Sequence, residues 1–316
     1  MKHWVLDVSL AVLLIWSVCI LASVTAEYFK IDKVETELAT TQLEQIKQID
    51  LLRGDKVVSL PLNEYLTGVL LCEVDADFHH TAKQAQAIVA RTYALRVLEN
   101  GIKHGKNIIC DRPECCQGYI APEEYEAKWG VSEPVASARR AVEETDGQVL
   151  TYAGSLIDAT YFSCSGGTTE DAKAVWGADV PYLRSVESPG EEGEDAYLQT
   201  ITFTPREFFE RLGLELTGRP ADWLGDWVYT DGGGVAAVTV CGHTFSGTQM
   251  RSRLGLRSTK FYITSTAESV LVTTKGYGHR VGMSQYGADA MAHGGASCEE
   301  ILKHYYTGVE LELYNE

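Results

Sequence analysis

The feature that most constrains the fold of this chain is a helical pattern over residues 62–73 that ends in an acidic residue. Four apolar side chains recur at the spacing of one helix face: Leu62, Leu66, Val69 and Leu70. This spacing predicts an amphipathic helix packed on a core, and the next position on the same face is Glu73. A buried carboxylate is costly unless it is protonated or paired, and burial raises its pKa, which prepares a general acid. Glu73 is therefore a candidate catalytic residue, and an ordinary structural role is the alternative.

A second helix is predicted directly after the first. Thr81 and Gln84 have the spacing of a capping box, and Asn100-Gly101 supplies a typical helix end. Arg91 lies within this alanine-rich run and can hold a carboxylate or a sugar hydroxyl. The alternative for Arg91 is a solvated or ion-paired arginine on the helix surface.

The composition of the chain indicates which kinds of ligand it can bind. The chain is 45% apolar and 22% charged, as expected of an ordinary folded protein. Its net charge of −17 argues against nucleic acid as a ligand, because phosphate binding requires a basic surface. We therefore expect no nucleic-acid partner.

The N-terminus departs from this globular pattern. Residues 8–26 contain no charged side chain and as a helix span roughly 28 Å, close to the thickness of the hydrocarbon core of a bilayer. We predict that residues 1–30 are a membrane anchor with one transmembrane helix, followed by a polar juxtamembrane stalk over residues 31–55. The expected location is a single-pass protein of the cell membrane with an extracytoplasmic domain. A cleaved signal peptide is the alternative.

The rest of the chain, residues 56–316, predicts one α+β domain with a helical part and a mixed β-rich part. It contains no internal repeat and no long linker. β-Branched and aromatic residues predict strands at residues 56–60, 148–163, 235–240 and 261–263. Helical patterns are found at residues 122–144, after Thr204-Pro205, and in the last third, where Ser297 and Glu300 form a capping box.

A histidine and a cysteine pair form a candidate metal site. His104, Cys110 and Cys116 are evenly spaced as His-x5-Cys-x5-Cys, and imidazole with two thiolates suits zinc. Cys115 or Asp111 is the candidate for a fourth ligand. Two alternatives stay open: a disulfide between Cys110 and one of the later cysteines, or neither a metal nor a disulfide.

Two loops are rich in glycine and in polar side chains that can bind a hydroxylated ligand. The candidate ligand-binding residues are Ser165, Gly166 and Gly167 in the first loop, and His279, Ser284 and Gln285 in the second. Glycine lets the backbone approach a ligand closely. The alternatives are a capped helix entry for the first loop and a tight turn with a hydrogen-bonded histidine for the second.

Three sequence blocks, in this order, carry a resemblance to a known family. They are Glu64-Tyr65-Leu66-x-Gly68-Val69 through Glu73 with Ala90-Arg91-Thr92-Tyr93-Ala94; Ser165-Gly166-Gly167 with Thr169-Glu170; and Gly278-His279 with Val281-Gly282-Met283-Ser284-Gln285-Tyr286-Gly287. On these blocks, which together cover about residues 56–316, the chain resembles the SpoIID/LytB domain family and in particular its sporulation members.

The resemblance implies a lytic transglycosylase that cleaves peptidoglycan glycan strands between N-acetylmuramic acid and N-acetylglucosamine, leaving 1,6-anhydro products, during engulfment of the forespore. The catalytic acid of the family falls on Glu73, and its basic residue falls on Arg91. The zinc ligands of some members fall on His104, Cys110 and Cys116, where the ion is expected to be mainly structural.

The family context also implies partners. It predicts a membrane complex with a peptidoglycan amidase and another sporulation membrane protein. Relatives that modify amidases supply the alternative function, a non-catalytic glycan-binding activator of such an amidase. The chain departs from the family pattern at Arg280, where Gly-His-Gly-Val is common, and at Val74-Asp75, where Met-Pro often follows the acid.

Overall fold

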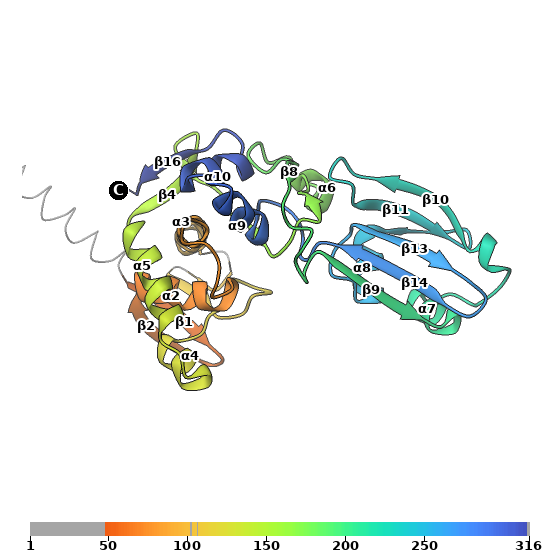
Figure 1. Ribbon diagram of the computed structural model, residues 1–316, viewed down its shortest axis with the longest axis horizontal. Helices are drawn as coiled ribbons and strands as arrows, with labels where there is room; N and C mark the ends of the chain where they lie inside the picture. Colours follow the sequence, from red (N-terminus) through yellow and green to blue (C-terminus); the bar gives the residue numbers. More distant parts are fainter. Residues whose placement is uncertain (1–47, 102, 106, 315–316) are drawn as a thin grey trace, which may run out of the picture. The chain divides into compact units, whose positions relative to one another are not determined.

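The amphipathic pattern of residues 62–73 folds as helix α2 (Leu62–Glu73), and the four side chains of its predicted apolar face are buried. The computed structural model describes residues 48–101, 103–105 and 107–314 (Figure 1). The described part from Ile49 to Tyr314 forms one unit. Glu73 is the last residue of α2, so the helix itself places this carboxyl at its end.

Helix α3 (His80–Asn100) is the longest helix among the described residues, and its alanine-rich face is buried. It contacts α2, α5 (Glu133–Glu144), α9 (Gln285–His293), α10 (Cys298–Tyr305) and β4 (Gln148–Tyr152). Gly101 ends it with a left-handed φ of 59°, as predicted. The predicted capping box is wrong: the cap is His79, whose Nδ1 accepts a hydrogen bond from the Thr81 backbone N–H at 3.2 Å.

The predicted helix over residues 122–144 is two helices, α4 (Pro122–Trp129) and α5 (Glu133–Glu144). Gly130 adopts a φ of 70°, which ends α4, and Pro134 lies in the first turn of α5. Because proline has no backbone N–H, it is tolerated in the first turn of a helix but not in its interior, so the chain starts a new helix here more easily than it continues α4.

The remaining helices are short. They are α6 (Ala172–Trp176), α7 (Pro205–Leu212), α8 (Gly247–Leu254), α9 (Gln285–His293) and α10 (Cys298–Tyr305), with one 3₁₀ turn, η1 (Pro220–Asp222). The capping box predicted at Ser297 and Glu300 is present at the start of α10.

The strands form small sheets. They are β1 (Gln48–Arg53), β2 (Lys56–Pro61), β3 (Ile108–Cys110), β4 (Gln148–Tyr152), β5 (Ser155–Leu156), β6 (Tyr161–Phe162), β7 (Gly167–Thr168), β8 (Glu187–Ser188), β9 (Leu198–Phe203), β10 (Leu224–Tyr229), β11 (Val235–Val240), β12 (His243–Ser246), β13 (Phe261–Ser265), β14 (Val270–Lys275), β15 (Met283–Ser284) and β16 (Glu310–Leu313). The strand orders are β2-β1-β3, β10-β11-β12, β13-β14-β9, β16-β4-β5, β15-β6 and β7-β8.

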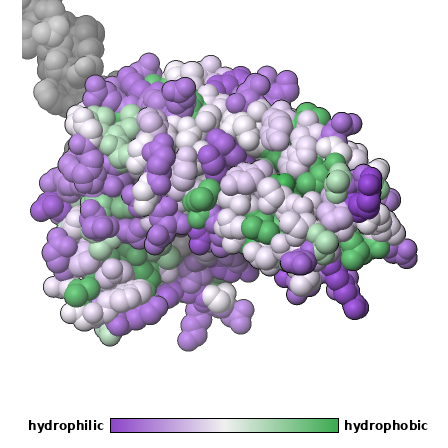
Figure 2. All heavy atoms as spheres, turned by 45° about the vertical axis from the view of Figure 1, so that its right-hand side comes forward, coloured by the Kyte–Doolittle hydropathy of each residue, from purple (hydrophilic) through white to green (hydrophobic). Residues whose placement is uncertain are grey.

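Two hydrophobic cores match the predicted α+β division. The first is formed around α3, β4, α9 and α10, and includes Ile88, Leu150 and Ile301. The second lies among the strands β9 to β14 and helices α7 and α8, and includes Phe208 and Val272. The surface face in Figure 2 is mostly polar, with hydrophobic residues in separate small patches.

The folded part begins earlier than the sequence prediction placed it. Strand β1 lies in the segment predicted as a stalk, and it pairs with β2 and, in parallel, with β3. Its alternating apolar residues Ile49 and Leu51 are buried, a pattern too short to separate from the polar run before it.

The predicted membrane segment, residues 8–26, lies outside the described residues and stays a prediction. Within the described part of the chain, no helix is both long enough and apolar enough to span a bilayer.

Candidate active site

The half-buried carboxyl group of Glu73 lines a cavity of about 820 Å³. A cavity of this size is typical of a small-molecule or oligosaccharide site. Its walls come from α2, the loop before α4, the end of β6 and the loop before β15. The lining side chains include Lys103, Glu114, Cys115, Cys116, Thr160, Tyr161, Ser163, Trp176, Arg251, Tyr277, His279 and Gln285.

The surroundings of Glu73 favour its protonated form. Burial raises the pKa of its carboxyl group above the ordinary value for glutamate. A hydrogen bond from the Gly118 backbone N–H to Oε1, at 2.8 Å, acts in the opposite direction, as do weaker contacts of Gln285 and Tyr161. On balance, the Glu73 carboxyl group keeps its proton to a higher pH than an exposed glutamate does. Once it loses the proton, the carboxylate still has hydrogen-bond donors around it.

The hydroxyl of Tyr161 is oriented by a chain of hydrogen bonds. Tyr65 donates its hydroxyl proton to Gln117 Oε1 at 3.0 Å, and Gln117 Nε2 donates to the Tyr161 hydroxyl oxygen at 3.1 Å. Since that oxygen accepts from Gln117, its own proton is free to point toward Glu73. Burial raises the pKa of Tyr161 well above its ordinary value, so it remains a donor.

A side chain at Gly118 would displace the carboxyl group of Glu73 or the thiol of Cys72. A Cβ at this position lies 2.8 Å from Cys72 Sγ and 3.0 Å from Glu73 Oε1. Sequence reasoning missed Gly118, Gln117 and Tyr161 as parts of the site. The Gln117-Gly118 pair after the two cysteines was the available signal, and it does not reveal which carboxyl group it meets.

His279 and Gln285, predicted to bind substrate, lie in the cavity with Glu73. The Nδ1 atom of His279 accepts from the Val281 backbone N–H at 3.1 Å, so the neutral ring carries its proton on Nε2. Burial, helped by Arg251, lowers the pKa of His279 to about 4, and the ring is therefore uncharged at neutral pH. It packs against Phe162 and Trp176. His279 thus forms part of the cavity wall and offers an uncharged hydrogen-bonding group to a ligand.

Arg251 supplies a positive charge that sequence reasoning did not find. It lines the cavity from helix α8, and its Nε donates to the Leu256 carbonyl oxygen at 3.4 Å. It forms no ion pair among residues 48–101, 103–105 and 107–314. Burial partly desolvates its charge and so lowers its pKa. A half-buried cation without a carboxylate partner favours a ligand that carries hydroxyl, amide or carboxylate oxygens.

The other predicted ligand-binding residues surround a carboxylate of the chain itself. Glu191 is buried, and its Oε2 accepts from Ser165 Oγ at 2.7 Å and from the Gly166 backbone N–H at 3.0 Å. Its Oε1 accepts from Ser284 Oγ at 2.5 Å. The Gly167 N–H donates to Ser165 Oγ at 2.9 Å. Ser165, Gly166, Gly167 and Ser284 thus have hydrogen-bond partners within the chain. Their role in substrate binding stays a prediction, and this geometry does not support it.

Arg91 is also placed away from the cavity. Its guanidinium group is buried and donates to the carbonyl oxygens of Val142, Thr145 and Gln148 at 3.0, 2.7 and 3.2 Å. These contacts satisfy the C-terminal end of α5. The catalytic role predicted for Arg91 stays a prediction, and its contacts favour a structural one.

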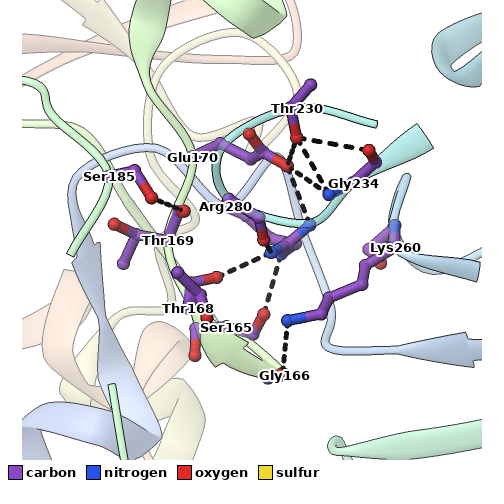
Figure 3. A network of polar contacts seen from close by, with 12 residues as sticks. Ser165, Gly166, Thr168, Thr169, Glu170, Ser185, Thr230, Gly234, Lys260 and Arg280 are labelled. Carbon is purple, nitrogen blue, oxygen red and sulfur yellow. Dashed lines mark hydrogen bonds and ion pairs between the residues drawn. The ribbon is translucent and has the colours of Figure 1, made fainter. Parts of the chain in front are cut away.

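Arg280, which departs from the common family pattern, is the centre of a buried polar network (Figure 3). Its Nη1 lies 3.1 Å from Glu170 Oε1, and its remaining donors bond to the carbonyl oxygens of Ser165, Thr168 and Gly232. Its backbone φ is 66°, a conformation that glycine adopts without strain. The side-chain contacts of Arg280 offset the strain of this backbone conformation, so the loop keeps it without a glycine.

The candidate metal ligands come together in the structure. One ligand atom from each of His104, Cys110, Cys115 and Cys116 lies within 4.8 Å of the others, and Cys115 Sγ is 3.3 Å from His104 Nε2. The described cysteines are free, so the disulfide alternative is not supported. Asp111 pairs with Arg53 instead, which leaves Cys115 as the fourth candidate ligand. Three thiol groups and an imidazole fit a soft divalent ion.

Comparison with known proteins relates this chain to sporulation proteins. The family model described as stage II sporulation protein matches residues 53–152. Stage II sporulation protein D of Bacillus amyloliquefaciens is 38% identical over 260 residues, which cover 81% of this chain and 75% of that protein. The same protein of Bacillus subtilis is 38% identical over 264 residues, covering 82% and 76%.

A more distant relative carries a different name. The amidase enhancer of Bacillus subtilis is 27% identical over 307 residues, which cover 79% of this chain and 40% of that protein. The identity and the coverage of both stage II sporulation proteins show the relationship: the chain belongs to the stage II sporulation protein D family.

Proposed function

We propose that this protein is a peptidoglycan lytic transglycosylase that cleaves the bond between N-acetylmuramic acid and N-acetylglucosamine during engulfment of the forespore. The observation that carries the proposal is the half-buried Glu73, with a raised pKa, on the wall of a large polar cavity. Membership of a sporulation family and a relative named for an amidase favour the cell wall as the place of action.

The chemistry needs one carboxyl group in two roles. Protonated Glu73 donates its proton to the glycosidic oxygen, and the bond from that oxygen to C1 of the muramic sugar breaks through an oxocarbenium-like transition state. The C6 hydroxyl of the same sugar then forms a bond to C1 and gives its proton to the Glu73 carboxylate. The Gly118 N–H, 2.8 Å from Oε1, stabilises that carboxylate between the two steps.

The carboxyl groups in this cavity fit such a mechanism better than hydrolysis by a pair of carboxylates. The residues lining it include one other carboxyl group, that of Glu114, which is exposed. Asp75, close to Glu73 in sequence, accepts a hydrogen bond from the Tyr286 hydroxyl at 2.5 Å. No residue of the described part that lines this cavity offers a second buried carboxyl group to activate a water molecule.

A digest of glycan tests the proposal. The full-length chain, incubated with glycan strands freed of stem peptides, is expected to release fragments that end in 1,6-anhydro sugars. Mass spectrometry distinguishes these fragments because each is one water molecule lighter than the product of hydrolysis. Reducing ends in place of anhydro ends contradict the transglycosylase and indicate a hydrolase.

The alternative function, an activator of a peptidoglycan amidase, is favoured by the name of the more distant relative. In that case the cavity binds glycan without cleaving it. The same digest decides between the two, because an activator releases no glycan fragments alone and increases peptide release by an added amidase. A complex with such an amidase and with another sporulation membrane protein is part of our proposal under either function.

We also propose that the ion held by His104, Cys110, Cys115 and Cys116 is zinc. A site with four protein ligands is closed and structural, because no position is left for a substrate. When bound, zinc ties the loop that carries Cys115 and Cys116 to the end of strand β3. That loop continues directly to Gly118, so the site fixes the donor to Glu73.

Metal analysis of the purified protein is expected to find close to one zinc per chain. The double replacement Cys110→Ser and Cys116→Ser is expected to remove the metal and lower the unfolding temperature, because binding free energy at such sites is folding free energy. Cys241→Ser, outside the cluster, is the control and is expected to retain the zinc. A wild-type protein that lacks zinc when purified without chelator contradicts the proposal.

A further inference from the structure

Glu73 borders a second cavity, of about 620 Å³, in addition to the one that contains His279. The second cavity lies against α4 and the end of α2. Its lining side chains include Arg53, Asp75, Tyr119, Glu124, Tyr125, Lys128 and Trp129. A polymer whose reacting bond lies at Glu73 has a sugar on each side of that bond, and the two cavities offer a place for each.

The second cavity has an aromatic wall, whose rings belong to neither of the two hydrophobic cores described above. The rings of Tyr125 and Trp129 lie 4.3 Å apart, one helical turn apart on α4, and Trp129 is 49% exposed. Tyr119 stacks on the buried ring of Tyr65 at 5.7 Å, which fixes its orientation. Aromatic rings of this kind pack on the C–H face of a pyranose, while their polar edges remain hydrated.

Charged groups stand beside these rings. Arg53 donates two hydrogen bonds to Glu124, at 3.1 and 2.9 Å, and its guanidinium group lies 5.3 Å from the centre of the Tyr119 ring. The Lys128 ammonium group lies 4.3 Å from the centre of the Trp129 ring. Fixed donors and acceptors next to aromatic faces match the hydroxyl and acetamide groups of an amino sugar.

We infer that the cavity lined by Tyr119, Tyr125 and Trp129 is a second subsite for the glycan strand and binds one amino sugar adjacent to the bond at Glu73. The inference rests on the proposed function, since it assumes a glycan at Glu73. A protein partner that docks on α4 is the competing occupant. The shared border with Glu73 favours the glycan, because the carboxyl group that reacts with the strand is itself part of this wall.

The test measures binding without turnover. The full-length chain carrying Glu73→Gln is titrated with a peptide-free hexasaccharide of alternating N-acetylglucosamine and N-acetylmuramic acid, using calorimetry. Adding Trp129→Ala is expected to weaken binding about tenfold, the loss of roughly one aromatic contact. Trp129→Phe is expected to restore most of the affinity because it keeps a ring. Val131→Ala, also exposed but outside the cavity lining, is the matched control.

The outcomes separate the inference from the function on which it rests. Unchanged hexasaccharide affinity in Trp129→Ala, with binding intact in its Glu73→Gln parent, overturns the subsite and leaves the transglycosylase standing. Loss of amidase binding with unchanged glycan affinity also overturns it and assigns α4 to a protein partner. If the Glu73→Gln chain binds no hexasaccharide and the wild type cleaves no glycan, the proposed function itself fails. Unfolding temperatures of the variants are measured alongside, and the expected change for Trp129→Ala is small.

Discussion

Replacing Glu73 by Gln is expected to lower the rate of glycan cleavage by about 10²- to 10⁴-fold, the usual contribution of general acid–base catalysis. Gln keeps the size of the side chain and can still accept the hydrogen bond from the Gly118 N–H. It cannot release or take up the proton that the reaction needs. The loss is therefore expected in the rate constant kcat, with KM for the glycan little changed.

A matched control comes from the same helix. Glu64 lies on α2, pairs with Arg139 at 3.4 Å, and lines neither cavity that borders Glu73. Glu64→Gln is expected to cleave glycan at the wild-type rate. Retained cleavage by Glu73→Gln contradicts the assignment and moves the proton donor to Glu114, the other carboxyl group among the residues that line the cavity. Glu170 is not the next candidate, because it is buried against Arg280.

The raised pKa of Glu73 also predicts how pH acts. The rate falls as pH rises through this pKa, because the acid must be protonated to start the reaction, and the fall comes at a higher pH than for an exposed glutamate. The contribution of Glu73 to the free energy of unfolding also falls as pH rises. A raised pKa in the folded state stabilises the protein below the pKa of the unfolded chain, and this contribution is lost as pH rises through the folded value.

Glutamine does not ionise, so Glu73→Gln loses no stability as pH rises through the pKa of Glu73. The variant is therefore expected to match or exceed the wild type in free energy of unfolding at neutral pH. The difference is expected to shrink as pH falls below about 4, where the carboxyl is protonated in both states. Thermal unfolding at several pH values measures it. A variant that is less stable than the wild type at neutral pH contradicts the desolvated environment inferred for Glu73.

The helical period could predict the place of Glu73 on α2, because position 73 continues the spacing of the buried residues Leu66, Val69 and Leu70 on the same helix. Its catalytic role stays a prediction. Its partners Gly118 and Tyr161 could not be predicted, since they come from other elements and depend on how the loop after β3 meets α2. The break at Gly130 was missed for a related reason. A glycine inside a helical pattern ends the helix only where the packing favours a change of direction.

The serine- and glycine-rich loops show a different limit. Their composition predicts backbone N–H and hydroxyl groups that can bind a hydroxylated ligand. It does not reveal that a carboxylate of the chain itself, Glu191, accepts hydrogen bonds from Ser165, Gly166 and Ser284. A sequence cannot distinguish a ligand carboxylate from one that belongs to the same chain, because both require the same donors.

The second large effect is expected at Arg280, where Arg280→Met is predicted to lower the free energy of unfolding by about 3–5 kcal/mol. The side chains of Arg280 and Glu170 are almost completely buried, with exposed fractions of 0% and 1%. Glu170 Oε1 also accepts from the Gly234 N–H at 3.0 Å and the Thr230 hydroxyl at 2.8 Å. Its Oε2 has no hydrogen-bond partner among the described residues, so its charge depends on Arg280.

Methionine fills much of the same volume but leaves that carboxylate unpaired in a low dielectric. It also leaves the carbonyl oxygens of Ser165 and Thr168 without their donor (Figure 3), and that of Gly232 as well. Urea unfolding measures the loss. Arg184→Met is the control: Arg184 pairs with Asp171 and Asp179 at 3.1 and 2.8 Å but is 39% exposed, so the expected cost is below about 1 kcal/mol.

A double variant separates the charge from the packing. If the unpaired carboxylate causes the loss, Glu170→Gln combined with Arg280→Met is expected to be more stable than Arg280→Met alone, since the amide carries no charge to desolvate. Equal stability of the two variants contradicts this cause and assigns the loss to the carbonyl contacts. Because residues 277–279 form part of the Glu73 cavity and lead directly into Arg280, the single variant is also expected to cleave glycan more slowly than the Arg184 control.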